Sequence, residues 1–298
     1  MNSSDEKKYL ERIAALEADL ANREQDLMLF REEISQLNEH LSDFITQVTH
    51  ELRMAQTIQK SLVPTEIPNI PGFEFSTKYE ASAISGGDYF DIFELSDKYR
   101  FGIVLSSSSG HGMSALFLSV LLRLTGQIEA RLGRSPHEVL RLMAKELDAN
   151  IQGDETASVF YAVIDRRRFE MEHCQVGDLM VLYHHSETDK LERFDSKAPA
   201  FFKGFHSDLK TQTQVLNPRD RLVLCSPGLV KVLNPSNEPF GEERLFKIIL
   251  GGSKLHAHEL RNEILFHTNQ FAAGREIERD LTLMVVDVQD KVIKLARP

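Results

Sequence analysis

The chain has 298 residues, of which 42% are apolar and 27% charged, an ordinary balance for a globular protein with a sizeable core. Its net charge of -10 argues against a nucleic-acid partner, because binding a phosphate backbone requires clustered lysine and arginine. The longest apolar runs fall short of the roughly 20 residues that cross a bilayer, so we expect a cytoplasmic protein without membrane insertion. Cys174 and Cys225 lack the spacing of a disulfide framework or a zinc site.

The first sixty residues have the composition of a helix, with no glycine or proline before Pro64. Apolar residues recur there at every seventh position from Ile13, and a second series beside it is interrupted by Arg23 and Glu51. A repeat sustained over seven heptads predicts a coiled coil and hence a homodimer. We expect its contacts to come from Ile13, Leu20, Leu27, Phe30, Ile34, Leu37, Leu41, Phe44, Val48, Ala55, Ile58 and Leu62. The alternative is a long amphipathic helix that lies on the chain's own globular domain.

Prolines from Pro64 onward end this helix, and the pattern then becomes mixed. We therefore expect a dimerisation helix over 1–63 and a globular domain over 64–298. Apolar runs predict strands over 73–78, 89–95, 99–105, 158–164, 169–174, 179–184, 221–225 and 281–288. Helical periodicity is seen over 113–132, 136–151, 241–250 and 256–270. Short polar turns join neighbouring strands, which predicts an α+β fold of mostly antiparallel sheets with helices on their faces.

Five short motifs follow one another between residues 51 and 288. The first reads ELxxAxxIQxxLxP over 51–64, and it is followed by GGDYFD at 86–91, SSSGHG at 107–112, SVFYAVID at 158–165 and FGEERL at 240–245. In this order and spacing the chain resembles the SpoIIE/RsbU-type branch of the PPM (type 2C) metal-dependent serine/threonine phosphatases, whose third motif reads DVSGHG. The resemblance implies an α-β-β-α sandwich. It also implies that active members use two manganese or magnesium ions to activate the water that hydrolyses phosphoserine or phosphothreonine.

The same resemblance assigns four aspartate positions to the metal site, and this chain keeps one of them. Asp88 is retained, whereas Ser107, Pro227 and Arg279 stand at the other three positions, and Gly110 belongs to the retained turn of this degenerate site. Carboxylate oxygens hold magnesium and manganese, so a hydroxyl and a proline ring are poor replacements. A guanidinium stays charged and repels a cation. We therefore expect no bound cofactor and no two-metal catalysis.

These losses indicate a pseudophosphatase that serves as a dimeric regulatory scaffold. For such a protein the resemblance implies a partner-switching pathway and a small STAS-type anti-sigma-factor antagonist as partner. A second interpretation is an active phosphatase with an atypical metal site built from Asp88, Asp91 and Asp280. Adjacent side chains in a strand point to opposite faces, so Asp280 should point away from the site if Arg279 points into it. A third interpretation is a signalling dimer that works mainly through its N-terminal helix.

Overall fold

The structure is a computed structural model of the chain, and it describes residues 3–62, 64, 66–82, 87–109, 120–121, 133–149, 151 and 153–289. The chain divides into two compact units, Met1–Met54 and Ala55–Pro298. Gly110 and most of the helix predicted over 113–132 lie outside the described residues, although residues 120 and 121 are helical. No helix in the described part is both long enough and apolar enough to cross a membrane.

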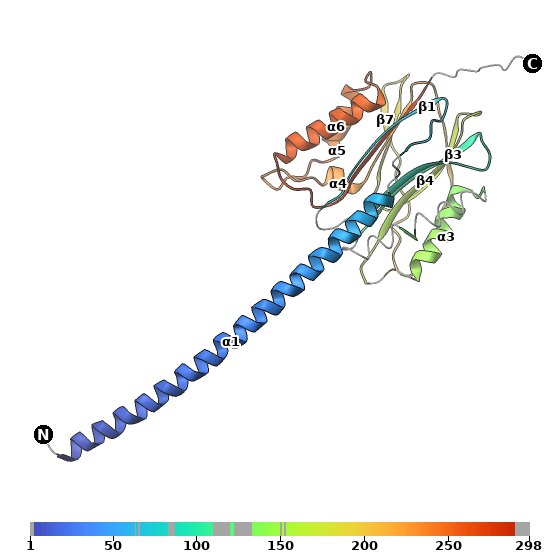
Figure 1. The fold of residues 1–298 in the computed structure, drawn as a ribbon. Helices are drawn as coiled ribbons and strands as arrows, with labels where there is room; N and C mark the ends of the chain where they lie inside the picture. The colour runs from blue at the N-terminus through green and yellow to red at the C-terminus, as the bar shows by residue number, and fades with distance from the viewer. Residues whose placement is uncertain are drawn as a thin grey trace, which may run out of the picture. The chain divides into compact units, whose positions relative to one another are not determined.

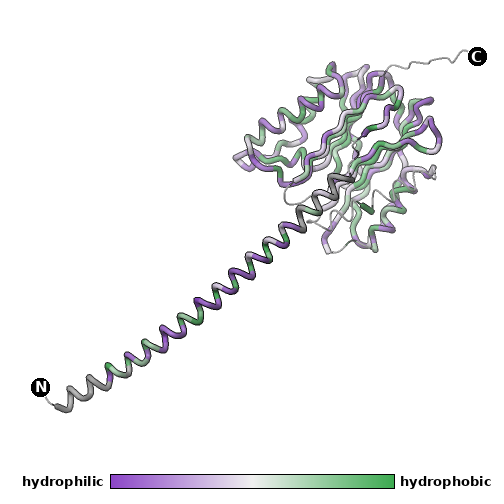
Figure 2. The backbone as a smooth tube through the Cα atoms, viewed as in Figure 1, coloured by the Kyte–Doolittle hydropathy of each residue, from purple (hydrophilic) through white to green (hydrophobic). Residues whose placement is uncertain are grey.

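The first element is α1, one continuous helix over Ser3–Leu62 (Figure 1). Its 60 residues correspond to about 90 Å at 1.5 Å per residue. Hydrophobic and hydrophilic residues alternate along its described length (Figure 2). The described apolar side chains of the heptad series are exposed in the single chain: Ile13, Leu16, Leu20, Leu27, Phe30, Ile34, Leu37, Leu41, Phe44 and Val48. The side chains of Ala55, Ile58 and Leu62 lie outside the described residues. The long helix is confirmed, and the coiled coil stays a prediction.

Two five-stranded antiparallel sheets form the body of the second unit. One sheet contains, in spatial order, β1 (Phe73–Glu80), β10 (Leu281–Val288), β9 (Arg221–Cys225), β6 (Met180–His185) and β7 (Lys190–Arg193). The other contains β2 (Asp88–Glu94), β3 (Arg100–Ser108), β4 (Ala157–Asp165), β5 (Glu170–Val176) and β8 (Gln212–Val215). The antiparallel pairing agrees with the short polar turns that the sequence places between successive strands.

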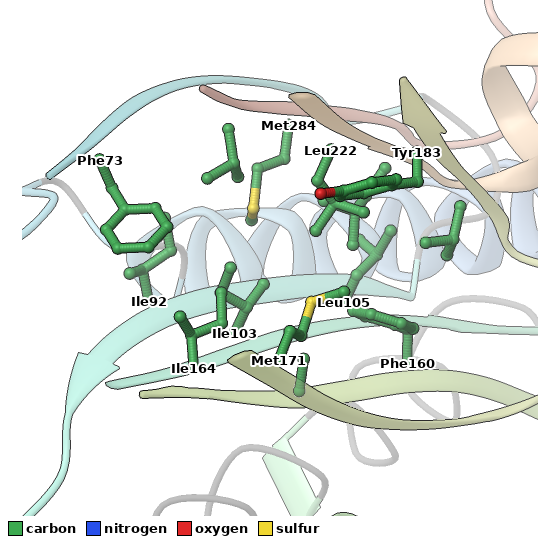
Figure 3. Close-up of a cluster of buried hydrophobic side chains, with 14 of the residues drawn as sticks. Phe73, Ile92, Ile103, Leu105, Phe160, Ile164, Met171, Tyr183, Leu222 and Met284 are labelled. Carbon is green, nitrogen blue, oxygen red and sulfur yellow. The ribbon is translucent and has the colours of Figure 1, made fainter. Parts of the chain in front are cut away.

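Between the two sheets lies the main hydrophobic core (Figure 3). Both sheets contribute side chains to it, including Phe73, Tyr183, Leu222 and Met284 from one sheet and Ile92, Ile103, Leu105, Phe160, Ile164 and Met171 from the other. Each apolar side chain of this size contributes about 1.5–3 kcal/mol when it is fully buried. This layer therefore holds the strand ends of the two sheets in a fixed mutual position.

Helices cover the outer faces of the two sheets (Figure 1). The one-turn helix α4 (Pro227–Val230), α5 (Glu242–Gly251) and α6 (Ala257–Ala272) share a hydrophobic cluster with the β1–β7 sheet. Helix α3 (Pro136–Asp148) packs on the β2–β8 sheet, and it begins with a capping box in which Glu138 accepts a hydrogen bond from the Ser135 N–H at 2.9 Å. The result is an α-β-β-α sandwich, as predicted.

Candidate functional site

Strand ends from both sheets meet at one end of the sandwich. In the antiparallel pairing of β2 with β3, Asp88 lies opposite Ser107. From the other sheet, β9 leads directly into Pro227 at the start of α4, and Arg279 precedes β10. The hydroxyl of Thr282 donates to Oδ2 of Asp88 at 2.8 Å and so connects the two sheets here.

Asp88 is buried, with 3% of its surface exposed. Burial raises the pKa of its carboxyl group to about 7, and the neighbouring carboxylate of Asp280 adds to this effect. Hydrogen bonds from the hydroxyl groups of Ser107, Ser226 and Thr282 act in the opposite direction. The retained aspartate is therefore held among hydroxyl donors in a poorly solvated position.

Asp280 lies beside Asp88 but binds the backbone. Its Oδ1 accepts a hydrogen bond from the Ser82 N–H at 2.8 Å. Its Oδ2 accepts one from the Tyr79 hydroxyl at 3.1 Å and one from the Asp88 N–H at 3.2 Å. This carboxylate also contributes to raising the pKa of Tyr79, after burial, which is the larger cause. Asp280 thus holds the approach to β2 in place, while its neighbour Arg279 lines a cleft.

Asp91, the third carboxylate considered above, is directed elsewhere. It stands three residues after Asp88 in the same strand, so the two side chains point to opposite faces of the sheet. Its carboxylate accepts hydrogen bonds from the Tyr89 hydroxyl at 2.9 Å and from the Ile92 N–H at 2.8 Å. The structure therefore brings Asp88 and Asp280 together and leaves Asp91 apart from them.

The cleft has a volume of about 350 Å³ and lies over this strand end. Ser107, Pro227 and Arg279 all line it, together with Lys231. One carboxylate, Asp178, is also part of the lining, and it forms an ion pair with Arg193 at 3.5 Å. Three of the four positions singled out from the sequence therefore face one cleft, and the fourth, Asp88, is buried beside Ser107.

The serines before Gly110 shape the edge of this cleft. The Ser108 hydroxyl donates to the Gly87 carbonyl at 3.0 Å. The hydroxyls of Ser109 and Thr156 lie 3.0 Å apart, and the Thr156 N–H donates to the Ser109 hydroxyl at 2.7 Å. Ser108 and Ser109 thus fix the backbone, whereas Ser107 directs its hydroxyl to Asp88.

Close backbone packing brings Pro227 and Arg279 together. A methyl group placed on Gly228 would lie 1.9 Å from the carbonyl oxygen of Asp280, so α4 approaches the start of β10 more closely than another residue permits. Lys231 follows Pro227 by four residues, and one helical turn places the two on the same side. Sequence reasoning missed Lys231, and this four-residue spacing is the signal that could have found it.

The donor atoms of this chain do not fit a pair of divalent ions. Asp88 and the hydroxyl group of Ser107 are the oxygen donors that remain at the four positions, whereas Arg279 brings a positive charge to the same lining. Among the described residues no group of three His, Cys, Asp or Glu side chains is arranged to hold a metal ion. We therefore derive no reaction step that needs two metals.

Comparisons with known proteins agree with the fold. Residues 97–289 match the family of stage II sporulation protein E (SpoIIE). Phosphoserine phosphatase RsbP of Bacillus subtilis is 24% identical over 252 residues, which cover 83% of this chain and 60% of RsbP, so the chain spans less than two thirds of this relative. The solved SiaA-PP2C domain of Pseudomonas aeruginosa has a TM-score of 0.68 at 16% identity, covering 82% of this chain and 98% of that domain. A structure of RsbX in complex with magnesium has a TM-score of 0.56 at 14% identity, covering 75% and 99%.

The comparisons correct one expectation. The sequence led us to expect no cofactor, whereas RsbX is solved with magnesium and the relative RsbP is named a phosphatase. The expectation of none was wrong, because magnesium or manganese is the cofactor of such proteins. Loss of a site for two metal ions does not exclude a single ion, because Asp88 remains as a carboxylate donor.

Proposed function

Because the chain belongs to the SpoIIE family, in the SpoIIE/RsbU branch of the PPM (PP2C-type) phosphatases, we propose that it is a pseudophosphatase in bacterial signalling. It binds a serine-phosphorylated partner in the cleft and hydrolyses the phosphate ester very slowly or not at all. A small STAS-type regulator of a partner-switching pathway is the partner we propose. The name of RsbP, a phosphoserine phosphatase, supports phosphoserine as the group that is recognised.

The observation that carries this proposal is the joint presence of Ser107, Pro227 and Arg279 in one cleft. Arginine binds phosphate through two parallel N–H···O bonds, and lysine acts as a point charge. Arg279 and Lys231 therefore offer a phosphoryl group the positive charge that a metal pair supplies in active relatives. The Ser107 hydroxyl adds a neutral hydrogen-bonding group. This lining favours binding of phosphate over activation of water.

A divalent ion remains compatible with this function. Asp88 and the Ser107 hydroxyl are the groups that would hold a single magnesium or manganese ion, which would supply additional positive charge for a phosphoryl oxygen. The residues of this chain do the rest: Arg279 and Lys231 orient the phosphate, and Thr282 holds Asp88 through the 2.8 Å hydrogen bond. Slow or absent hydrolysis does not require that the cleft be free of metal.

The pseudophosphatase proposal is tested by measuring turnover and phosphopeptide binding separately. With manganese and p-nitrophenyl phosphate, the full chain should show no turnover above that of a Ser107→Ala control. A phosphoserine peptide should bind, and Arg279→Ala should weaken binding at least ~10-fold, or about 1.4 kcal/mol. Arg168→Ala is the matched control, because Arg168 is exposed and does not line the cleft. Metal-dependent turnover that Ser107→Ala leaves unchanged but Asp88→Asn abolishes would refute the pseudophosphatase.

Restoring the carboxylates provides the converse test. The triple variant Ser107→Asp, Pro227→Asp and Arg279→Asp places aspartate at the positions that the family assigns to it. We expect manganese-dependent hydrolysis to appear in this variant and to be absent when Asp88→Asn is added. A triple variant that folds, binds manganese and remains inactive would mean that the three losses do not explain the lack of turnover.

An active phosphatase with an atypical site is less well supported by the geometry. Asp91 is on the opposite face of β2 from Asp88, and Asp280 is engaged by the N–H groups of Ser82 and Asp88. Three carboxylates therefore do not converge on the cleft. Turnover that depends on both Asp88 and Asp280, in variants whose thermal stability is unchanged, would favour this alternative.

We further propose that residues 1–63 dimerise the protein as a coiled coil and that residues 64–298 form the phosphatase-like domain. The exposed heptad side chains of α1 support this, since Leu27 and Phe44 alone are 58% and 63% exposed in the single chain. Helices in proteins gain most of their stability from packing an apolar face against another element. In this arrangement the helix pair relays a signal to the cleft. Mass measurement by light scattering tests the dimer, and a monomer at micromolar concentration would refute it.

A further inference from the structure

A groove of about 450 Å³ lies on one face of α1, near the start of the apolar heptad series. We label the heptad positions a to g with Ile13 at a, which places Arg23 at d. In a coiled coil each a or d side chain inserts into a hole that four residues of the facing helix form. The groove residues make up two such neighbouring holes: Ile13, Leu16, Glu17 and Leu20 form one, and Leu16, Asp19, Leu20 and Arg23 form the other. The groove therefore has the lining that a second helix with the same repeat would need.

Arg23 is the polar exception in this stretch of the apolar series. Its Nε forms an ion pair with Oδ2 of Asp19 at 3.0 Å, and both side chains are exposed in the single chain. A second helix would cover Arg23, and a covered charge is costly unless it is fully paired. Glu24, the next residue, is exposed at position e and forms no ion pair with any residue that the structure describes. Its carboxylate is therefore available to a second copy of the helix.

We propose that α1 pairs with α1 of a second copy in parallel and in register, and that Arg23 fixes this alignment. In such a pair the hole opposite Arg23 consists of Leu20, Arg23, Glu24 and Leu27 of the partner subunit. Each guanidinium then lies between Asp19 of its own helix and the partner's Glu24. This offsets both the repulsion between the two arginines and that between Asp19 and the partner's Glu24. The alignment rests on the dimer proposed above and adds its orientation and register.

Charged residues beside the apolar series favour the same alignment. In a parallel pair, position g of one helix faces position e of the next heptad on the other helix, and ion pairs between them set orientation. Arg12 then faces Glu17 and Asp26 faces Arg31, and each of these is a pair of opposite charges. A slip of one heptad would instead place Arg23 of one helix beside Arg31 of the other. Pairing in register therefore avoids a repulsion between two arginines that has no carboxylate between them.

An antiparallel pair lacks these contacts. There each d side chain faces an a side chain of the other helix, and every a position from Ile13 to Val48 is apolar, so Arg23 would be covered by an apolar side chain. The other polar residue of the d series is Glu51, whose side chain lies outside the described residues. In the parallel pair both helices reach Leu62 at the same end. Both chains therefore continue from that end into the domain that contains the cleft.

Disulfide cross-linking of the full chain tests the alignment. Leu16→Cys and Leu37→Cys are both at position d, where a parallel pair in register brings the two copies of a side chain together, and the native Cys174 and Cys225 are buried. After mild oxidation each variant should form a covalent dimer, whereas Gln25→Cys, at the outward position f, should not. A protein that is dimeric by light scattering but fails to cross-link at either d position would overturn the alignment. A monomer by light scattering under reducing conditions would instead refute the proposed dimer itself.

Charge reversal and removal test the role of Arg23. Glu24→Lys should raise the dissociation constant of the dimer at least ~10-fold, because it places a lysine beside the partner's Arg23. Glu32→Lys is the matched control, since Glu32 is an exposed glutamate at position f, which points away from the partner. Arg23→Leu should leave the dimer at least as tight but lower the cross-linking yield of Leu16→Cys at least ~2-fold, because slipped and antiparallel pairs become available. Equal effects of the two lysine variants, or an unchanged yield with Arg23→Leu, would overturn the role of Arg23.

Discussion

His173 should make the folded domain sensitive to acid, and His173→Phe should remove that sensitivity. Burial lowers the pKa of His173 from 6.5 to about 4, and the carboxylate of Glu192 opposes this only in part. Below pH 6.5 the unfolded chain therefore binds a proton that the folded chain does not. The stabilising effect of the neutral ring is complete above pH 6.5 and is lost as the pH falls towards 4. At 1.36 kcal/mol per pKa unit, the loss approaches on the order of 3 kcal/mol.

Urea unfolding of the full chain and of His173→Phe at several pH values between 7.5 and 4.5 measures this effect. The chain has six tyrosines and no tryptophan, so tyrosine fluorescence follows the transition. Because Phe160 and Phe194 flank the ring, phenylalanine should be tolerated there at neutral pH within about 1.5 kcal/mol. The difference between the two proteins should then shift in favour of the variant as the pH falls. Parallel pH profiles would mean that His173 titrates normally and that its ring is solvated.

Three further predictions concern packing and assembly. Gly228→Ala should lower the free energy of unfolding by several kcal/mol in a thermal melt, because its methyl group would lie 1.9 Å from the carbonyl oxygen of Asp280; an unchanged melting temperature would contradict that close approach. Arg221→Ala should destabilise the domain by about 3–5 kcal/mol in urea, since Arg221 is 5% exposed and bonds to Asp287 at 2.8 Å, and a loss below 1 kcal/mol would show a solvated pair. Leu27→Glu should convert the dimer to a monomer in light scattering, and an unchanged mass would place the dimer contact elsewhere.

The two strands that the sequence missed, β7 and β8, are short edge strands, whereas the longer edge strands β1 and β2 were predicted. All eight predicted strands are present, because buried strands such as β4 and β9 are continuous apolar runs. Strands β7 and β8 were missed, since Lys190–Arg193 and Gln212–Val215 are short and mostly polar. Their pairing is decided by the backbone of β6 and β5, respectively. Helix α4, with four residues, is too short for periodicity to reveal it.

The cleft and His173 differ in how far the sequence reveals them. Spacing relative to known motifs predicted which residues replace the aspartates of the cleft, because Ser107 and Arg279 stand at fixed positions beside recognisable neighbours. No motif marks His173. Its burial, with 4% of its surface exposed, is known only from the structure. In the sequence it is an ordinary polar residue of an alternating strand.

The hydrogen bonds around Asp88 explain how the site persists with its altered residues. A buried carboxylate needs compensation for lost hydration, and in an active metal site the ions provide it. Here the Thr282 hydroxyl donates to Asp88 at 2.8 Å, and the hydroxyls of Ser107 and Ser226 also act to lower the pKa of Asp88. An aspartate at position 107 would instead add a second negative charge opposite Asp88 in the β2–β3 pair. Serine therefore stabilises the fold by the same change that weakens metal binding. Arg279 and Lys231 also place positive charge in the lining of the cleft, which under the proposed function attracts phosphate.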